Sequence, residues 1–196
     1  MKCDFIEIGT SDFDNLISNA TTEIGISIEP VKVYFDNLPN KANVIKLNCA
    51  IGDIDSIETT YWVSPEDILK YNLPNWMRGC SKVGEIHPLI HTELMNRDIL
   101  NICQKTECTI ISWNTLVEKY SIESVEFLKI DTEGFEYKIL NNLLNSNSSV
   151  YPKQIQFEDK DFTDEIELNN ILTKFSNIGY MVSKADHFDY LLTLND

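Results

Sequence analysis

The sequence predicts an α/β fold in which a mostly parallel sheet is covered by helices on both faces. Short apolar runs alternate with segments whose apolar residues recur at helical spacing, as in a doubly wound sheet. The clearest unit spans 127–140, where an apolar run stops at an acidic turn and resumes as an amphipathic pattern. Two further apolar runs, at 180–183 and 190–194, close the chain and predict an antiparallel terminal hairpin across 185–189.

The first part of the chain is expected to form short strands and helices in alternation. Apolar runs predict the strands, and the amphipathic segments between them predict the helices. In chain order, the expected elements are a strand at 5–8, a helix at 13–20, a strand at 24–28, a helix at 31–38 and a strand at 44–47.

The segment from about 53 to 108 is less regular and is expected to carry substrate recognition. After it, the pattern predicts a helix around 116–120, the strand and helix of the acidic unit, a strand at 154–158 and a helix at about 165–175. With 196 residues, of which 43% are hydrophobic, the chain is long enough for one well-buried domain and short for two. We therefore expect a single domain spanning 1–196, with a substrate-recognition insert.

Two carboxylates mark the end of the predicted strand at 127–130. Asp131 and Glu133 follow it directly, and Gly134 is expected to open the next helix. In open α/β sheets, ligands bind at the carboxyl ends of the strands. A ligand site at this turn is therefore favoured over ordinary hydration of a loop.

The acidic turn also carries a family resemblance. The segment from Lys129 to Glu136, Lys-Ile-Asp-Thr-Glu-Gly-Phe-Glu, resembles the signature of the FkbM family of S-adenosylmethionine-dependent methyltransferases. Further segments resemble family blocks in the same order, namely 5–12, 26–30, 47–53 and 112–116. The resemblance implies the Rossmann-like class I methyltransferase fold, with a seven-stranded sheet and an antiparallel C-terminal hairpin.

The candidate cofactor residues lie at the ends of the first three strands. Gly9 permits a tight turn and close approach of a ligand, and the absence of a Gly-x-Gly-x-x-Gly fingerprint disfavours a dinucleotide enzyme. Glu29, followed by the helix-starting Pro30, is placed to accept the ribose hydroxyls. Ala50 and Ile51 are expected to flank the adenine. The candidates for the amino-acid end of S-adenosylmethionine are Glu7, Thr10, Ser11 and Asp12.

Methyl transfer to an oxygen needs a positioned acceptor and a group that takes the hydroxyl proton. Asp131 is the first candidate, as a base or as a ligand of a divalent ion, and it would also contact the cofactor. Glu133 and His87 are the other catalytic candidates, although Glu133 also suits the first turn of a helix, where an acid offsets the macrodipole. With Glu158, the acids Asp131 and Glu133 would suit Mg²⁺, but the sequence does not require a metal.

Aromatic and polar residues of the insert are candidates for acceptor binding. Trp62, Trp76 and Arg78, together with Glu158, would hold a sugar or another polar acceptor, and packing of the insert is the alternative role for the first three. His87 and His91 are four residues apart, near several cysteines, but the spacing matches no regular zinc pattern. Pro88 also argues against a continuous helix through His87.

The resemblance implies an O-methyltransferase acting on a small polar or glycan hydroxyl, with a sugar favoured. The alternative, from another class of function, is a non-catalytic binding or assembly domain of the same fold. The acids at positions 29 and 131 favour the enzyme. A Rossmann-like enzyme with a nucleotide cofactor is disfavoured because the chain has no phosphate-binding loop.

Composition limits the kinds of binding partner and the cellular compartment that we expect for this protein. A formal net charge of -15 with scattered basic residues argues against nucleic-acid binding. No apolar run approaches the roughly 20 residues that cross a bilayer, and no signal peptide precedes the first strand, so we expect a cytoplasmic protein that does not bind membranes. The five cysteines suit a reducing compartment. A homo-oligomer, a small version of the fold and a domain fused to glycosyltransferase modules all remain open.

Overall fold

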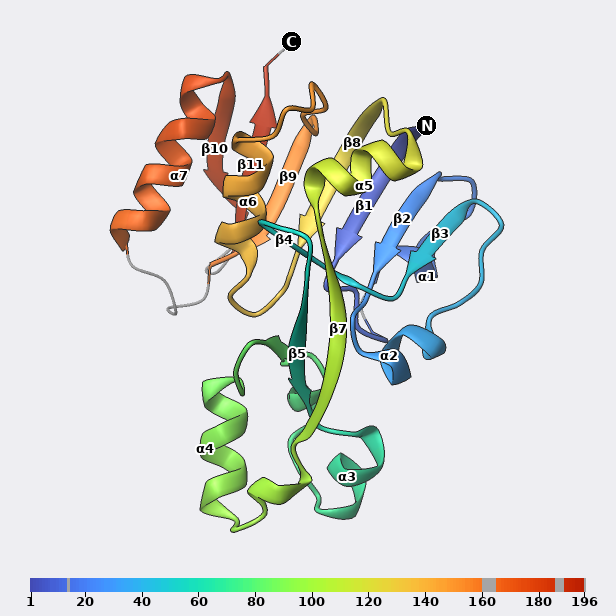
Figure 1. Cartoon of the computed structure of the whole chain (residues 1–196), viewed down its shortest axis with the longest axis vertical. Coiled ribbons are helices and arrows are strands. Elements are labelled where there is room, and N and C mark those ends of the chain that lie inside the picture. The colour runs from blue at the N-terminus through green and yellow to red at the C-terminus, as the bar shows by residue number, and fades with distance from the viewer. Residues whose placement is uncertain (14, 160–164, 186–188, 196) are drawn as a thin grey trace.

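The main sheet has seven strands in the order β10-β11-β9-β8-β1-β2-β3 (Figure 1). A computed structural model describes residues 1–13, 15–159, 165–185 and 189–195. The strands are β1 (Lys2–Ile8), β2 (Gly25–Ile28), β3 (Val44–Leu47), β8 (Ser124–Ile130), β9 (Gln154–Glu158), β10 (Tyr180–Lys184) and β11 (Asp189–Leu194). Neighbours from β3 to β9 pair in parallel, whereas β11 runs antiparallel to both β9 and β10. The antiparallel terminal pair is therefore confirmed, while residues 186–188 between its strands lie outside the described residues.

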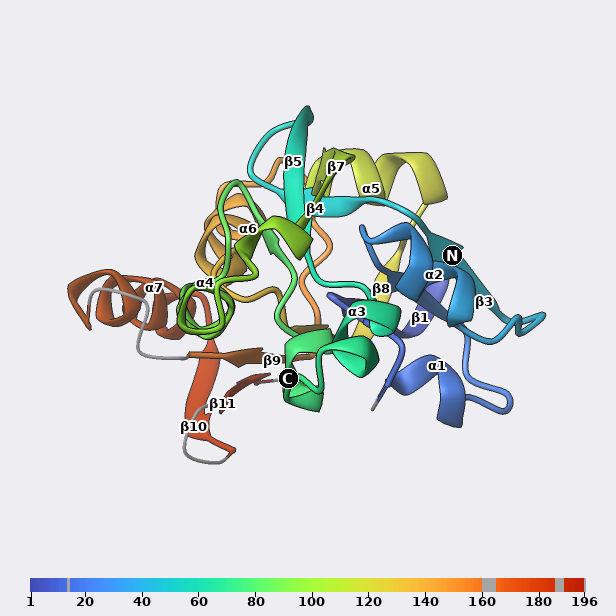
Figure 2. The same ribbon diagram turned by 90° about the horizontal axis from the view of Figure 1, so that it is seen from below.

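Helices cover both faces of this sheet, as the sequence predicts. The helices that follow strands of the main sheet or connect it to the insert are α1 (Leu16–Asn19), α2 (Lys32–Asn37), α5 (Trp113–Tyr120), α6 (Glu136–Leu144) and α7 (Glu165–Asn177). Apolar residues of α5, α6 and α7 share the largest core cluster with β1, β2, β8 and β9. Helix α1 lies on the opposite face, in a smaller cluster around Phe5 (Figure 2).

Alternation along β1 explains these two cores. Ile6 and Ile8 belong to the cluster under α5, α6 and α7, whereas Phe5 belongs to the cluster under α1. Gly25 of β2 is the registered neighbour of Phe5. A β-carbon on Gly25 would lie 2.4 Å from the Phe5 ring. The strand therefore needs glycine at this position to leave room for the aromatic side chain.

The insert is more regular than the sequence suggested, and that expectation was wrong. It forms most of a second sheet, of order β4-β7-β5-β6, which extends away from the carboxyl edge of the main sheet (Figure 1). The elements are β4 (Ala50–Gly52), β5 (Ser56–Trp62), α3 (Pro65–Lys70), η1 (Asn75–Arg78), β6 (Lys82–Val83), α4 (Pro88–Asn96), η2 (Leu100–Ile102) and β7 (Gln104–Ser112). The insert also has its own apolar cluster, formed by Val63, Ile68, Leu73, Met77, Cys80, Ile90, Leu94 and Ile102.

Element boundaries differ from the expectations in a few places. Helix α1 begins at Leu16 rather than at 13, and α2 begins at Lys32, after Pro30. Helix α6 begins at Glu136 instead of at Gly134, because Glu133 and Gly134 both have positive φ angles, of 55° and 111°, and cannot belong to a right-handed helix. The strands of the main sheet match the expected positions within a few residues.

Within the described ranges, the chain has no helix that combines the length and the apolar character needed to cross a membrane.

Exchange of Gly25 for alanine should destabilise the protein by about 1–3 kcal/mol, because the new methyl group overlaps a rigid ring buried in the core. The second exchange, Phe5→Leu, should recover part of this loss, since it removes the overlapping atoms. Urea unfolding of the two single variants and the double variant measures the coupling. Strictly additive losses would show that the two positions do not compete for the same space.

Candidate functional site

The loop after β1 and the acidic turn after β8 lie against each other. β1 and β8 are parallel neighbours, so both end at the same edge of the sheet. Gly9 has a φ of 81°, and a β-carbon there would lie 1.7 Å from the carbonyl oxygen of Asp131. The Asp131 N–H in turn donates to the carbonyl of Ile8 at 2.9 Å. Only glycine fits this contact, which fixes the two loops side by side.

A first pocket opens beside this contact and encloses about 510 Å³, including the part open to solvent. Its walls combine apolar side chains such as Ile51, Val83 and Phe135 with the carboxylate of Glu29. Its other lining residues are Ile8, Gly9, Ser11, Ile28, Pro30, Cys49, Ala50, Arg78, Gly79, Ser81, Asp131 and Thr132. Of the ten candidate cofactor residues, seven therefore line one pocket: Gly9, Ser11, Glu29, Pro30, Ala50, Ile51 and Asp131.

Glu29 links the first loop to the start of α2. One carboxylate oxygen accepts from the Ser11 N–H at 2.7 Å, and the other accepts from the Val31 N–H at 2.7 Å. The side chain is only 3% exposed, and this burial raises the pKa of Glu29 to about 7, against the lowering effect of the two N–H donors. The same acid thus shapes the loop and places a titratable group in the pocket.

A second pocket, of about 700 Å³ including open space, adjoins the first. The two pockets share Gly9, Ser11, Gly79 and Asp131 as lining residues. The second is also lined by Thr10, Phe13, Trp76, Cys80, Lys129 and Glu133. The second pocket therefore combines acids, a cation and aromatic rings, whereas the first pocket places Glu29, Asp131 and Arg78 among mainly apolar walls.

Glu7 lines neither of these pockets. It is fully buried, and one of its carboxylate oxygens lies 3.2 Å from the Lys129 ammonium. The other oxygen accepts from the Leu16 N–H at 3.0 Å, at the start of α1. Burial raises the pKa of Glu7, while Lys129 opposes the shift. In this structure Glu7 therefore positions Lys129, which does line the second pocket.

Asp12 also lies outside the two linings and connects the first loop to the insert. Its carboxylate pairs with the Arg78 guanidinium at 2.5 Å and accepts from the Asn37 amide at 3.0 Å. The Arg78 guanidinium also lies over the Phe13 ring, 5.6 Å from its centroid. Arg78, at the end of η1, is thus held over the first pocket by the loop that follows β1.

The two catalytic candidates of the acidic turn, Asp131 and Glu133, lie near Glu158 at the end of β9. Carboxylate oxygens of Asp131, Glu133 and Glu158 lie within 4.8 Å of one another. Glu133, only 5% exposed, also lies 3.2 Å from Nε2 of His87. His87 is the N-cap residue of α4, so the prediction that Pro88 interrupts a helix through His87 is confirmed, and His91 is exposed.

Glu136 has a structural role that sequence reasoning missed. Its carboxylate accepts from the N–H groups of Thr132 at 2.6 Å and Gly134 at 2.8 Å, and burial raises its pKa. The suggested placing of Glu133 in the first helical turn was wrong, because Glu136 occupies that turn. The sequence did contain a signal for this role, because Glu136 is the last acid of the signature segment.

The aromatic candidates separate in the structure. Trp76 is 42% exposed and lines the second pocket. Trp62 lines neither pocket: its indole N–H donates to the Thr106 hydroxyl at 3.0 Å, and its ring meets Tyr34 edge to face. These contacts are those expected of the packing role that the sequence left as the alternative, and acceptor binding by Trp62 stays a prediction. The pocket residues that sequence reasoning missed include Lys129, Ser81, Val83 and Phe135. Lys129 and Phe135 belong to the signature segment, which could have marked them, whereas no pattern marks Ser81 and Val83.

The raised pKa of Glu29 predicts a pH dependence of stability. Between about pH 4.5 and pH 7 Glu29 is protonated when folded and ionised when unfolded, so unfolding releases a proton and the free energy of unfolding falls as the pH rises. Relative to Glu29→Gln, the wild type should lose up to about 3 kcal/mol across this window. Urea unfolding at a series of pH values measures the difference. The exposed-residue control, Glu118→Gln, should follow the wild-type curve, and a Glu29→Gln curve parallel to both would contradict the assignment.

Comparison with known proteins points to one family. A family model described as the methyltransferase FkbM domain matches residues 8–192, nearly the whole chain. Comparisons with curated proteins and with solved structures gave no match. The matched range includes both pockets, the acidic turn and the complete insert. The chain therefore belongs to the FkbM methyltransferase family.

Proposed function

We propose that this protein is an S-adenosylmethionine-dependent O-methyltransferase that acts on a hydroxyl of a small polar or glycan acceptor, with a sugar as the favoured substrate. The observation that carries the proposal is the pair of adjoining pockets with a common wall at Gly9, Ser11, Gly79 and Asp131. One pocket suits a nucleoside and the other suits a polar acceptor, so two reactants would meet beside Asp131.

The first pocket has the chemistry that S-adenosylmethionine requires. Ile51, Val83 and Phe135 offer apolar surfaces for an adenine ring. Each oxygen of the Glu29 carboxylate accepts one backbone N–H and retains capacity for a second donor, such as a ribose hydroxyl. Arg78 is already paired with Asp12, so the Asp131 carboxylate and, above about pH 7, the ionised Glu29 favour a cationic ligand over a pyrophosphate. When bound, the cofactor supplies an electrophilic methyl group on a sulfonium centre.

In the second pocket, the chain's own residues would orient the acceptor and manage its proton. Asp131, on the common wall, is placed to accept the hydroxyl proton as general base. The Lys129 ammonium, held by Glu7, would stabilise negative charge on the acceptor oxygen. Trp76 and Phe13 provide faces on which a sugar ring would pack.

A divalent ion is compatible with this proposal but not required by it. The oxygen atoms of Asp131, Glu133 and Glu158 form a hard donor set of the kind that Mg²⁺ prefers. Proton transfer to Asp131 needs no metal. Acceptor screens should therefore be run with and without Mg²⁺.

Calorimetric titration with S-adenosylhomocysteine should show micromolar binding to the wild type and loss of that binding in Glu29→Ala, because the carboxylate that accepts the ribose hydroxyls is gone. The exposed-site control, Glu118→Ala, should bind like the wild type. Absence of binding to the wild type would remove the methyltransferase proposal and favour a non-catalytic binding or assembly domain.

Asp131→Asn should lower methyl transfer by at least about 100-fold, since an amide does not act as a general base. The assay follows transfer of labelled methyl groups to nucleotide sugars and glycans, and calorimetry with S-adenosylhomocysteine shows whether the cofactor pocket is intact. Transfer at the wild-type rate in Asp131→Asn would exclude Asp131 as the base.

A further inference from the structure

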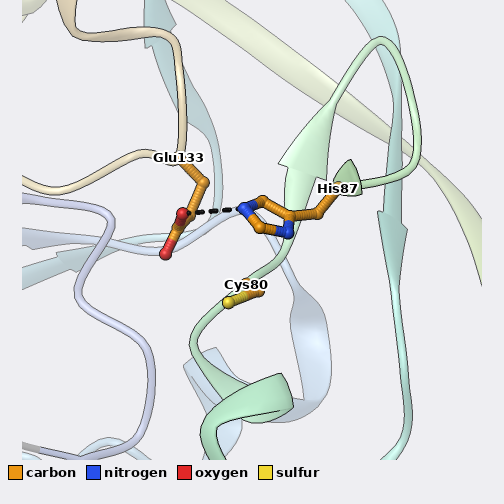
Figure 3. A group of neighbouring side chains, drawn as sticks. All are labelled: Cys80, His87 and Glu133. Carbon is orange, nitrogen blue, oxygen red and sulfur yellow. Dashed lines mark ion pairs between the residues drawn. The ribbon is translucent and has the colours of Figure 1, made fainter. Parts of the chain in front are cut away.

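A thiol, an imidazole and a carboxylate meet at the boundary between the insert and the main sheet. Cys80, His87 and Glu133 are all buried, and one ligand atom of each lies within 4.8 Å of the others (Figure 3). Cys80 follows η1, His87 precedes α4, and Glu133 lies in the turn between β8 and α6. Three separate segments of the chain thus bring three different metal-ligand types to one place.

We propose that Cys80, His87 and Glu133 bind a zinc ion through the thiolate, Nε2 and a carboxylate oxygen. The metal-binding proposal does not depend on the proposed methyl transfer. Sequence spacing did not indicate this site, because Cys80 and His87 come from the insert whereas Glu133 comes from the signature turn.

The distances suit a tetrahedral metal. Nε2 of His87 and a carboxylate oxygen of Glu133 are 3.2 Å apart. Two ligands that each bind zinc at about 2.0–2.1 Å with tetrahedral angles are about 3.3 Å apart. The sulfur of Cys80, which has a longer bond to zinc, lies within 4.8 Å of both. Small side-chain adjustments would therefore complete the three-ligand set.

The backbone holds two of the ligands in place. Glu133 has a φ of 55°, unusual for a residue other than glycine, and the N–H of the following Gly134 is held by Glu136. Backbone strain of this kind occurs where side-chain direction matters for function. His87 caps α4 and directs its ring toward Glu133 (Figure 3). The cluster is therefore largely preformed.

The helix cap competes with zinc for the imidazole. Nδ1 of His87 accepts from the Leu89 N–H at 3.3 Å, so a neutral ring carries its proton on Nε2. Coordination through Nε2 would move this proton to Nδ1 and break the cap. A single cap bond of this length is weak beside zinc coordination, so the metal should prevail.

Donor type distinguishes this cluster from the neighbouring acids. A thiolate, an imidazole and a carboxylate favour zinc, whereas the all-oxygen set of Asp131, Glu133 and Glu158 favours magnesium. Binding would displace the thiol proton of Cys80 to solvent, and the two negative ligands would balance the charge of Zn²⁺. Three protein ligands leave a fourth position for water.

The test is competition for zinc between the chelator-treated full-length protein and a chromophoric chelator. The wild type should bind one equivalent, and Cys80→Ser and His87→Asn should each weaken the affinity at least about 100-fold, since loss of a direct ligand should cost no less than loss of an outer-shell partner. Asparagine retains helix-capping ability, so His87→Asn removes the ligand while sparing α4. Circular dichroism and thermal unfolding check that both variants fold.

Two matched controls separate this site from its surroundings. Cys103→Ser removes another cysteine of the insert, and Glu158→Gln disables the all-oxygen set, and both should bind zinc like the wild type. Cobalt substitution should give a thiolate-to-cobalt charge-transfer band that Cys80→Ser lacks. The proposal is overturned if the wild type binds no zinc, if Cys80→Ser binds as tightly as the wild type, or if Glu158→Gln loses the metal. Because the readout is metal binding, failure here is distinct from failure to bind S-adenosylhomocysteine.

Discussion

The arrangement of this site depends on the contact between Gly9 and the carbonyl of Asp131. A side chain at Gly9 would overlap that oxygen at 1.7 Å, so the loops that follow β1 and β8 lie against each other only because this residue is glycine. The contact makes one wall for two pockets, and Asp131 belongs to both. A larger residue would separate the loops and with them the two pockets. The charged groups of the site can therefore take their positions only because the backbone at Gly9 carries no side chain.

Buried acids then fix the loops around that contact. Glu29 accepts from Ser11 and from the start of α2, and Glu136 accepts from two N–H groups of the acidic turn. Glu7 does the same at the start of α1 while holding Lys129. Burial raises the pKa of all three acids, so the protein accepts a desolvation cost in order to hold its loops. Part of the chain's acid content therefore lies in the interior, where these side chains hold loops, and not only on the surface.

The insert completes the site from the other side. Its ion pair from Arg78 to Asp12 fastens η1 to the loop after β1. Arg78, Ser81 and Val83 line the first pocket, Cys80 lines the second, and Gly79 lines both. The insert also brings His87 against Glu133. Its own apolar cluster and the pairing of β5 with β7 give these contacts a stable support. The same segment thereby contributes to the walls of both pockets.

The sequence by itself determined the type of the main-sheet elements and their order along the chain. Alternation and helical spacing are local properties, so they can be read from a short stretch of one sequence. The sequence also located Gly9, Glu29 and Asp131, since each directly follows a recognisable strand. Tertiary structure alone decided that the insert forms a second sheet, that Glu7 faces Lys129 and that His87 meets Glu133. These features join residues 46 to 122 positions apart, or pair strands across the insert, and local pattern carries no information about such partners. The physical reason is that side-chain partners across segments are chosen by packing and burial of the whole fold, which no short window of sequence contains.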